Sequence, residues 1–205
     1  VIIFSVIQFT LWRYVSKVDE EYICKNVFIG KTDVSGMTKE EAVKAVDNTL
    51  GDYRNKQLVL KVKDQGADVS IEEMGAEVEN IDKLAEKAVG YGKNGSIWSR
   101  YQKIHNLDKK KYVIDESFKV DEAKLRELIQ ERAVPLEQKA VNASASYNGS
   151  GFDLTDEAEG YTVDVDKSVK KIKNFMNKKW NYEDAEVELK LDMEKPTIKK
   201  ADLES

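Results

Sequence analysis

Cysteine and histidine are almost absent from this sequence of 205 residues, and each shortage excludes a kind of chemistry. Cys24 is the single cysteine, so no disulfide can form within the chain. His105 is the single histidine, so a zinc site of the cysteine–histidine type cannot be built. The common catalytic and phosphate-binding motifs are missing as well. We therefore expect no metal, no cofactor and no catalytic centre in this chain.

A surplus of positive charge is also missing. The sequence has 33 Lys and Arg against 38 Asp and Glu, a formal net charge of −5. Proteins that bind nucleic acid need positive charge to displace counterions, so we expect no nucleic-acid partner. The charged fraction of 35% excludes a protein with many membrane spans, and the hydrophobic fraction of 41% excludes a wholly disordered chain. The length allows one domain or two small ones.

The longest hydrophobic run lies at the N-terminus. Residues 1–15 read VIIFSVIQFTLWRYV, with no charge before Arg13. The run is shorter than the ~20 apolar residues that span a bilayer. However, it is already apolar at its first residue, and aromatic and basic residues close it, as at a membrane interface. The run predicts a truncated transmembrane helix at residues 1–16, followed by a juxtamembrane stalk at 17–26. The alternative is a buried core helix or strand.

The rest of the sequence reads as one pattern written twice, at residues 27–108 and 109–205. In the first copy, a strand precedes a helix that opens with the capping box Thr38-Lys-Glu-Glu41. Alternating apolar residues then predict a hairpin that turns at Asp64-Gln65-Gly66, and a second helix runs from about Asn80 to Gly90.

The second copy has the same order of elements. Asp121 is placed to cap a helix that ends near Pro135, and Asn148-Gly149 is a strong hairpin turn signal. A helix from about Asp166 and a strand at 186–198 complete it. The pattern β-α-β-β-α, given twice, predicts an α+β fold of two tandem repeats with mainly antiparallel sheets.

One segment between the two copies carries a candidate binding site. Trp98, Arg100 and Tyr101 follow the glycine-rich end of the second helix, in a stretch that we interpret as a linker. Carbohydrates stack on exposed aromatic rings and accept hydrogen bonds from arginine, so these three residues are the candidate ligand-binding residues. The alternative is that Trp98 and Tyr101 pack between the two repeats. His105 is interpreted as a linker residue.

Other reactive or charged side chains have simpler explanations. Cys24 has acids before it and no nearby base, which does not suit a nucleophile. Glu72-Glu73, Asp156-Glu157, Asp164 and Asp166 lie beside turns or helix starts, where acidic side chains cap exposed N–H groups or are solvated. The lysines of the last helix either form a solvated face or attract an anionic polymer such as teichoic acid or glycan-linked stems. These lysines are Lys167, Lys170, Lys171, Lys173, Lys178 and Lys179.

A family resemblance follows from two motifs. Ile29-Gly-Lys-Thr-Asp-Val-Ser-Gly36-Met-Thr-Lys-Glu-Glu-Ala42 resembles the opening of peptidoglycan-binding repeats in bacterial cell-envelope proteins. Gly160-Tyr-Thr-Val-Asp164, with the later Lys195-Pro196-Thr197, is similar to their second part. Such repeats precede a VanW-type domain in YoaR-like proteins, and the catalytic YkuD domain in some L,D-transpeptidases of Gram-positive bacteria. The YkuD signature and a VanW-type region are both absent from this chain.

The resemblance implies a non-enzymatic, extracytoplasmic module held at the cell membrane by a single pass, with the lipid bilayer and peptidoglycan as partners. In one reading the module binds peptidoglycan and spaces a downstream VanW-type domain. In a second it is the non-catalytic N-terminal region of an L,D-transpeptidase that cross-links peptidoglycan. In a third it is a spacer or protein-interaction module without glycan affinity. Residues 199–205 resemble the linker into a further domain.

Overall fold

The structure is a computed structural model that describes the backbone of residues 2–204 and the side chains of residues 6–204. Positions 1 and 205, which begin the predicted membrane helix and end the second predicted repeat, lie outside the described residues. The chain forms two compact units. Unit 1 comprises Val1–Arg54 and Glu77–Lys119, and unit 2 comprises Asn55–Ala76 and Val120–Ser205.

The N-terminal helix α1 (Ile2–Val15) has 14 residues. At 1.5 Å per residue it is about 21 Å long, against the ~30 Å hydrocarbon core of a bilayer. Within residues 2–204, no helix combines the length and the apolar character needed to cross a membrane. The predictions of a transmembrane helix at 1–16, a lipid bilayer partner and a single-pass membrane location are therefore corrected. Instead, α1 packs against α4 (Ile97–Asn106) in unit 1, where Val15 is buried.

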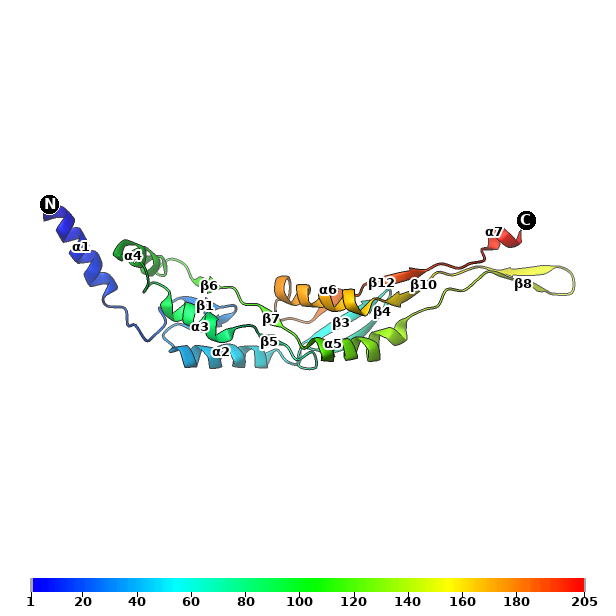
Figure 1. Cartoon of the computed structure of the whole chain (residues 1–205), viewed down its shortest axis with the longest axis horizontal. Coiled ribbons are helices and arrows are strands. Elements are labelled where there is room, and N and C mark those ends of the chain that lie inside the picture. Colours follow the sequence, from blue (N-terminus) through cyan, green and yellow to red (C-terminus); the bar gives the residue numbers. More distant parts are fainter. Residues whose placement is uncertain (1, 205) are drawn as a thin grey trace. The chain divides into compact units, whose positions relative to one another are not determined.

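Unit 1 combines short strands with four helices (Figure 1). Its three-stranded sheet has the order β2-β1-β6, with β1 antiparallel to β2 and parallel to β6. A second, antiparallel pair joins β5 to β7. Besides α1 and α4, the elements are β1 (Val27–Ile29), β2 (Thr32–Asp33), α2 (Lys39–Asp52), β5 (Glu77–Val78), α3 (Ile81–Gly90), β6 (Tyr112–Ile114) and β7 (Phe118–Lys119).

The capping box predicted for α2 is confirmed. The Thr38 hydroxyl accepts from the Glu41 N–H at 3.3 Å, and the Glu41 carboxylate accepts from the Thr38 N–H at 2.9 Å. This start directs Ala42, Val46 and Leu50 into the interior. Apolar side chains from α2, α3 and the strands form one core, in which each fully buried Val, Leu or Ile side chain contributes about 1.5–3 kcal/mol. The core includes Ile23, Val27, Ile29, Val34, Ala42, Val46, Ala85, Ala88, Leu107 and Ile114.

Unit 2 is built on the three-stranded sheet β11-β3-β4 and the pair β10-β12. Strand β3 alternates buried and half-buried side chains, which confirms the predicted hairpin face. The elements are β3 (Gln57–Val62), β4 (Gln65–Ser70), α5 (Glu122–Leu128), a π-helical turn (Ile129–Ala133), a 3-10 turn (Val134–Leu136), β8 (Ser144–Tyr147), β9 (Phe152–Thr155), β10 (Gly160–Val163), α6 (Val165–Lys178), β11 (Ala185–Glu188), β12 (Leu191–Glu194) and α7 (Lys200–Leu203).

The caps of unit 2 follow the sequence. At the start of α5, the Asp121 carboxylate accepts hydrogen bonds from the N–H groups of Ala123 and Lys124. At the start of α6, the Asp164 carboxylate accepts one from the N–H group of Lys167. The α-helix after Asp121 ends at Leu128. A wider π-helical turn and then a 3-10 turn continue it, and the 3-10 turn contains Pro135, which cannot donate a backbone hydrogen bond.

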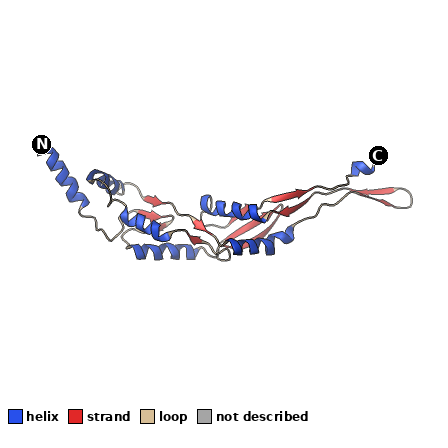
Figure 2. Ribbon diagram, in the orientation of Figure 1, coloured by secondary structure: helices blue, strands red, loops and turns tan. Residues whose placement is uncertain are grey.

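The hairpins of unit 2 are also close to the prediction. The β3–β4 turn lies at Lys63-Asp64, one residue before the predicted position. The β8–β9 hairpin, which turns at the predicted Asn148-Gly149, extends away from the other strands of unit 2 (Figure 2). In the described chain, five of the seven strand pairings are antiparallel. The fold is α+β with mainly antiparallel sheets, as predicted.

Candidate functional site

Helix α4 forms where the sequence suggested a linker. The Ser96 hydroxyl caps it by accepting from the Ser99 N–H at 3.3 Å, and Ile104 faces the interior. Trp98, Tyr101 and His105 are three and four residues apart, so they share one side of the helix. The helical period was present in the sequence, but the glycine-rich stretch before it hid the pattern.

The three aromatic side chains form a ladder along α4. The rings of Trp98 and Tyr101 stack with centroids 5.8 Å apart, and those of Tyr101 and His105 stack at 5.5 Å and an angle of 5°. Tyr14 of α1 packs edge-on against Tyr101 at 5.1 Å. Such pairs are worth about 0.5–1.5 kcal/mol each beyond simple burial. Trp98, at the open end of the ladder, remains 56% exposed.

A groove of about 620 Å³ lies between α1 and α4, beside this ladder. Its size is within the range of small-molecule sites, about 300–1,000 Å³. We call it the aromatic groove. It is lined by Thr10, Leu11, Arg13, Tyr14, Lys17, Tyr101, His105 and Asp108.

Asp108 is the carboxylate of the aromatic groove. It forms an ion pair with Lys25 at 2.6 Å and accepts a hydrogen bond from the Tyr14 hydroxyl at 3.4 Å. The bond from Lys25 holds the pKa of Asp108 below its ordinary value, whereas partial burial, followed by the charge of Asp108, raises the pKa of Tyr14. At neutral pH the groove therefore offers one ionised carboxylate and one protonated phenol, beside the cations Arg13 and Lys17.

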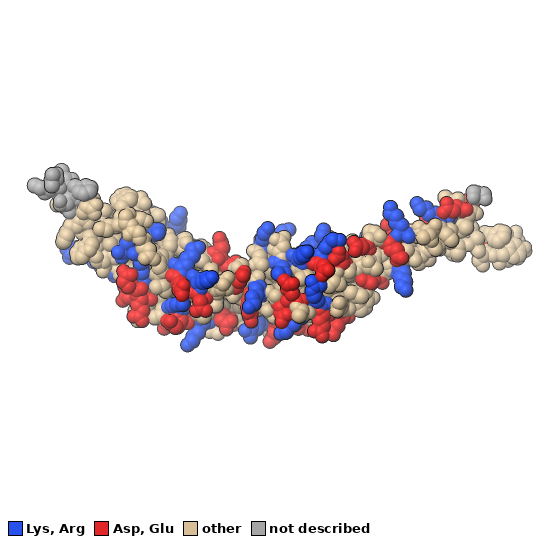
Figure 3. Space-filling view, viewed as in Figure 1, with Lys and Arg blue, Asp and Glu red and all other residues tan. Residues whose placement is uncertain are grey.

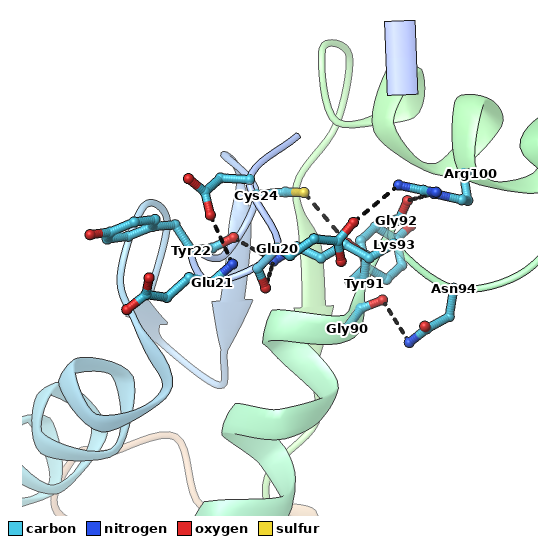
Figure 4. Close-up of polar contacts among 11 residues, drawn as sticks. Glu20, Glu21, Tyr22, Cys24, Gly90, Tyr91, Gly92, Lys93, Asn94 and Arg100 are labelled. Carbon is cyan, nitrogen blue, oxygen red and sulfur yellow. Dashed lines mark hydrogen bonds and ion pairs between the residues drawn. The ribbon is translucent and has the colours of Figure 1, made fainter. Parts of the chain in front are cut away.

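Arg100 lies on a different side of α4 from the ladder. Its Nε donates to the Gly92 carbonyl at 3.4 Å, and its guanidinium forms an ion pair with Glu20 at 3.4 Å (Figure 4). The side chain is 21% exposed. The structure therefore brings Trp98 and Tyr101 together and directs Arg100 toward the turn before α4.

Lys93 is a structural residue that the sequence analysis missed. It is only 7% exposed, and its ammonium group donates to the carbonyls of Glu20 and Tyr22 at 2.9 and 2.7 Å (Figure 4). These bonds tie the segment after α1 to the turn before α4, and so they help to position both walls of the aromatic groove. Sequence gives no signal for this role, because a lysine in a glycine-rich turn is normally solvated.

Two other groups have structural roles. Burial raises the pKa of the Cys24 thiol, which donates to the Tyr91 carbonyl at 3.4 Å; a nucleophilic thiolate needs the opposite shift. Glu73 accepts from the N–H and hydroxyl of Ser70 at 2.8 and 3.0 Å, which is a capping arrangement, as predicted for this acid. Among residues 2–204, no cluster of three or more His, Cys, Asp or Glu side chains is arranged to hold a metal ion.

Comparison with known families identifies the chain at the family level. A family model described as "Putative peptidoglycan binding domain" matches residues 67–185, more than half of the chain. The chain belongs to this family. The comparison with curated proteins found no match, and the comparison with solved structures also found none.

Family membership confirms the predicted resemblance at the level of peptidoglycan binding. The matched residues of this peptidoglycan-binding domain include α4 with Trp98, Arg100 and Tyr101, but not α1. The motif Ile29–Ala42, which carried most of the resemblance, lies outside the match. The family description names a binding domain and no reaction.

Proposed function

We propose that this chain is a non-catalytic cell-wall module that binds the glycan strand of peptidoglycan in the aromatic groove. The ladder of Trp98, Tyr101 and His105 carries the proposal, because its exposed end at Trp98 lies beside a groove of suitable size that Tyr101 and His105 line. Family membership supports peptidoglycan as the polymer.

The chemistry of the groove suits a sugar chain. The faces of pyranose rings carry C–H groups that pack against aromatic rings, whereas their edges carry hydroxyl and acetamido groups that need hydrogen-bond partners. Trp98 and Tyr101 supply the aromatic face. Asp108 accepts hydrogen bonds from hydroxyl groups, and the Tyr14 hydroxyl lies beside it. In this proposal Arg100 is a positioning residue that holds α4, and not a ligand contact.

The test measures binding of the full chain to stem-free glycan strands, which an amidase releases from purified sacculi and which are then attached to beads. The double variant Trp98→Ala and Tyr101→Leu removes two stacking faces. At about 0.5–1.5 kcal/mol for each aromatic contact, we expect about 5- to 150-fold weaker binding.

The matched control removes two exposed aromatic side chains elsewhere. Tyr147 and Phe152, which are 65% and 69% exposed, lie on the β8–β9 hairpin, and their replacement by Ala should leave binding unchanged. Equal loss in both double variants, or no binding by the unaltered chain, would reject the aromatic groove as a glycan site. The presence of a VanW-type or YkuD domain in the same protein stays a prediction from the resemblance.

A further inference from the structure

Unit 2 carries a second hollow, of about 400 Å³, with a different chemistry. It opens between the end of β3, α6 and the start of β12. We call it the lysine hollow. Its lining consists of the four lysines Lys61, Lys63, Lys171 and Lys190, the acid Glu188, and the apolar Leu189, Leu191 and Met193.

The backbone around the lysine hollow is held in place. The Ser168 hydroxyl, which belongs to a fully buried residue of α6, accepts from the Lys190 N–H at 2.9 Å. The Lys190 carbonyl accepts from the Asp164 N–H at 2.8 Å, and the Leu189 N–H donates to the Lys61 carbonyl at 2.9 Å. The four lysines therefore come from β3 and the turn after it, from α6, and from the connection between β11 and β12. Hydrogen bonds of the backbone and of Ser168 join these three segments, as a preorganised site requires.

The four ammonium groups of the hollow have no ion-pair partner among the described residues. Lys63 instead lies over the Tyr161 ring, 5.8 Å from its centroid. By contrast, the neighbouring lysines on α6 are paired, Lys167 with Asp164 at 2.5 Å and Lys173 with Glu122. Glu188 is the one carboxylate in the lining of the hollow, and it forms no ion pair with these four lysines among the described residues.

Four positive charges against one negative charge make this hollow basic in a chain whose net charge is −5. Figure 3 shows Lys and Arg side chains gathered over α6. Because like charges in one concave surface reinforce each other, the hollow attracts a ligand that carries more than one negative charge.

We propose that the lysine hollow binds a short anionic peptide with several carboxylates and small aliphatic side chains. The lysines suit the carboxylates, and Leu191 and Met193 give a surface for methyl groups. A phosphodiester polymer would match the charge but would leave this apolar surface without a partner. The stem peptides of peptidoglycan combine carboxylates with alanine methyl groups. We identify the anionic peptide as such a stem peptide, and this identification rests on the proposed function.

The experiment titrates the full chain by calorimetry with an N-acetylated stem tetrapeptide, free of sugar. We expect saturable binding that weakens as the ionic strength rises from about 0.05 M to about 0.5 M, since screening reduces the attraction between charges. The same peptide with its carboxylates converted to amides should bind about tenfold more weakly or not at all.

The decisive variant is Lys171→Gln with Lys190→Gln, which we expect to weaken the tetrapeptide about tenfold. Its matched control is Lys170→Gln with Lys178→Gln. These two lysines are exposed on the same helix, do not line the hollow and change the net charge equally. The control should bind the tetrapeptide like the unaltered chain. Equal effects in both variants would mean general attraction, and would overturn the proposal.

Other outcomes separate this inference from the glycan site. Binding of stem-free glycan without binding of the tetrapeptide would overturn the inference and leave the proposed function intact. Binding of the tetrapeptide, lost only in Lys171→Gln with Lys190→Gln, would support the inference even if stem-free glycan did not bind. Stronger binding of a glycerol phosphate polymer than of the tetrapeptide would also overturn it.

Discussion

At the scale of single residues, the side chain of Lys93 links two parts of unit 1. Its ammonium group satisfies the carbonyls of Glu20 and Tyr22, which lie between α1 and β1. The Lys93 side chain is buried, and hydrogen bonds from a charged group are worth about 1.5–3 kcal/mol.

Lys93→Met keeps the length of the side chain and removes both bonds. We expect the free energy of unfolding of unit 1 to fall by about 1–3 kcal/mol, measured by urea denaturation with circular dichroism. Lys109→Met is the control, because Lys109 is an exposed lysine of the same unit. Equal midpoints for the Lys93 and Lys109 variants would contradict the structural role of Lys93.

Glu73 gives a prediction about pH. The guanidinium of Arg132, followed by the N–H of Ser70, lowers the pKa of Glu73 to about 2. An unfolded glutamate has a pKa of about 4.3, so the ionised form stabilises the fold. This contribution is complete above the unfolded value and is lost as the pH falls toward 2. Because both side chains are more than one third exposed, solvent screening limits it to about 0.5–1 kcal/mol.

Glu73→Gln should therefore lower the free energy of unfolding of unit 2 at about pH 6. Between about pH 4.3 and about pH 2, this free energy should fall less steeply than in the unaltered chain. Urea unfolding at several pH values measures this. Glu72→Gln, one residue earlier in the same turn, should keep the slope of the unaltered chain. An unchanged slope in Glu73→Gln would show that the pair with Arg132 does not persist in solution.

At the scale of elements, α4 depends on the turn before it. Gly92 has φ +80°, and a Cβ atom there would lie 2.9 Å from Ile104 Cγ1. Gly36 also has a positive φ, +72°, but a Cβ atom there would have no neighbour within 4 Å. The two glycines therefore separate the cost of a strained backbone from the cost of a close approach to α4.

Gly92→Ala and Gly36→Ala should each lose about 1–2 kcal/mol from the left-handed backbone. The clash with Ile104 should cost Gly92→Ala on the order of 1 kcal/mol more, and should also weaken glycan binding by moving α4. Thermal unfolding and sacculus binding of both variants test this. If the two variants lose equal stability and bind equally, the turn does not position α4.

The local elements were largely predictable from the sequence, and the reasons are local. The capping box at Thr38, the cap at Asp121 and the turn at Asn148-Gly149 depend on residues within four positions of each other. The aromatic pair Trp98 and Tyr101 was found as a candidate for the same reason. Arg100 and Lys93 differ, because their partners at Glu20 and Tyr22 are about 70–80 positions away in the sequence, and no local pattern reports such contacts.

At the scale of the whole molecule, each unit uses strands from both halves of the sequence. In unit 1, β1 pairs in parallel with β6, and in unit 2, β3 pairs in parallel with β11. Sequence periodicity predicts where strands form but not which strands pair. The pairing of strands from the two halves of the sequence could therefore not be predicted. The duplication of residues 27–108 and 109–205 stays a prediction.

These pairings between the two halves of the sequence predict how fragments of the chain behave. A fragment of residues 1–108 lacks β6 and β11, so the parallel partners of β1 and β3 are missing and buried residues such as Ile29 and Leu60 become exposed. We expect neither 1–108 nor 109–205 to unfold cooperatively alone, and a mixture to regain a cooperative transition by circular dichroism. Independent, cooperative folding of both fragments would contradict the observed pairings.

The most direct test of the glycan site is an NMR titration of the full chain with short, stem-free glycan strands. We predict that the largest shift changes fall on the Trp98 indole N–H and on the backbone of α4, with smaller changes along residues 10–17, at the end of α1 and just after it. Absence of shift changes, or changes confined to residues away from the aromatic groove, would contradict the account.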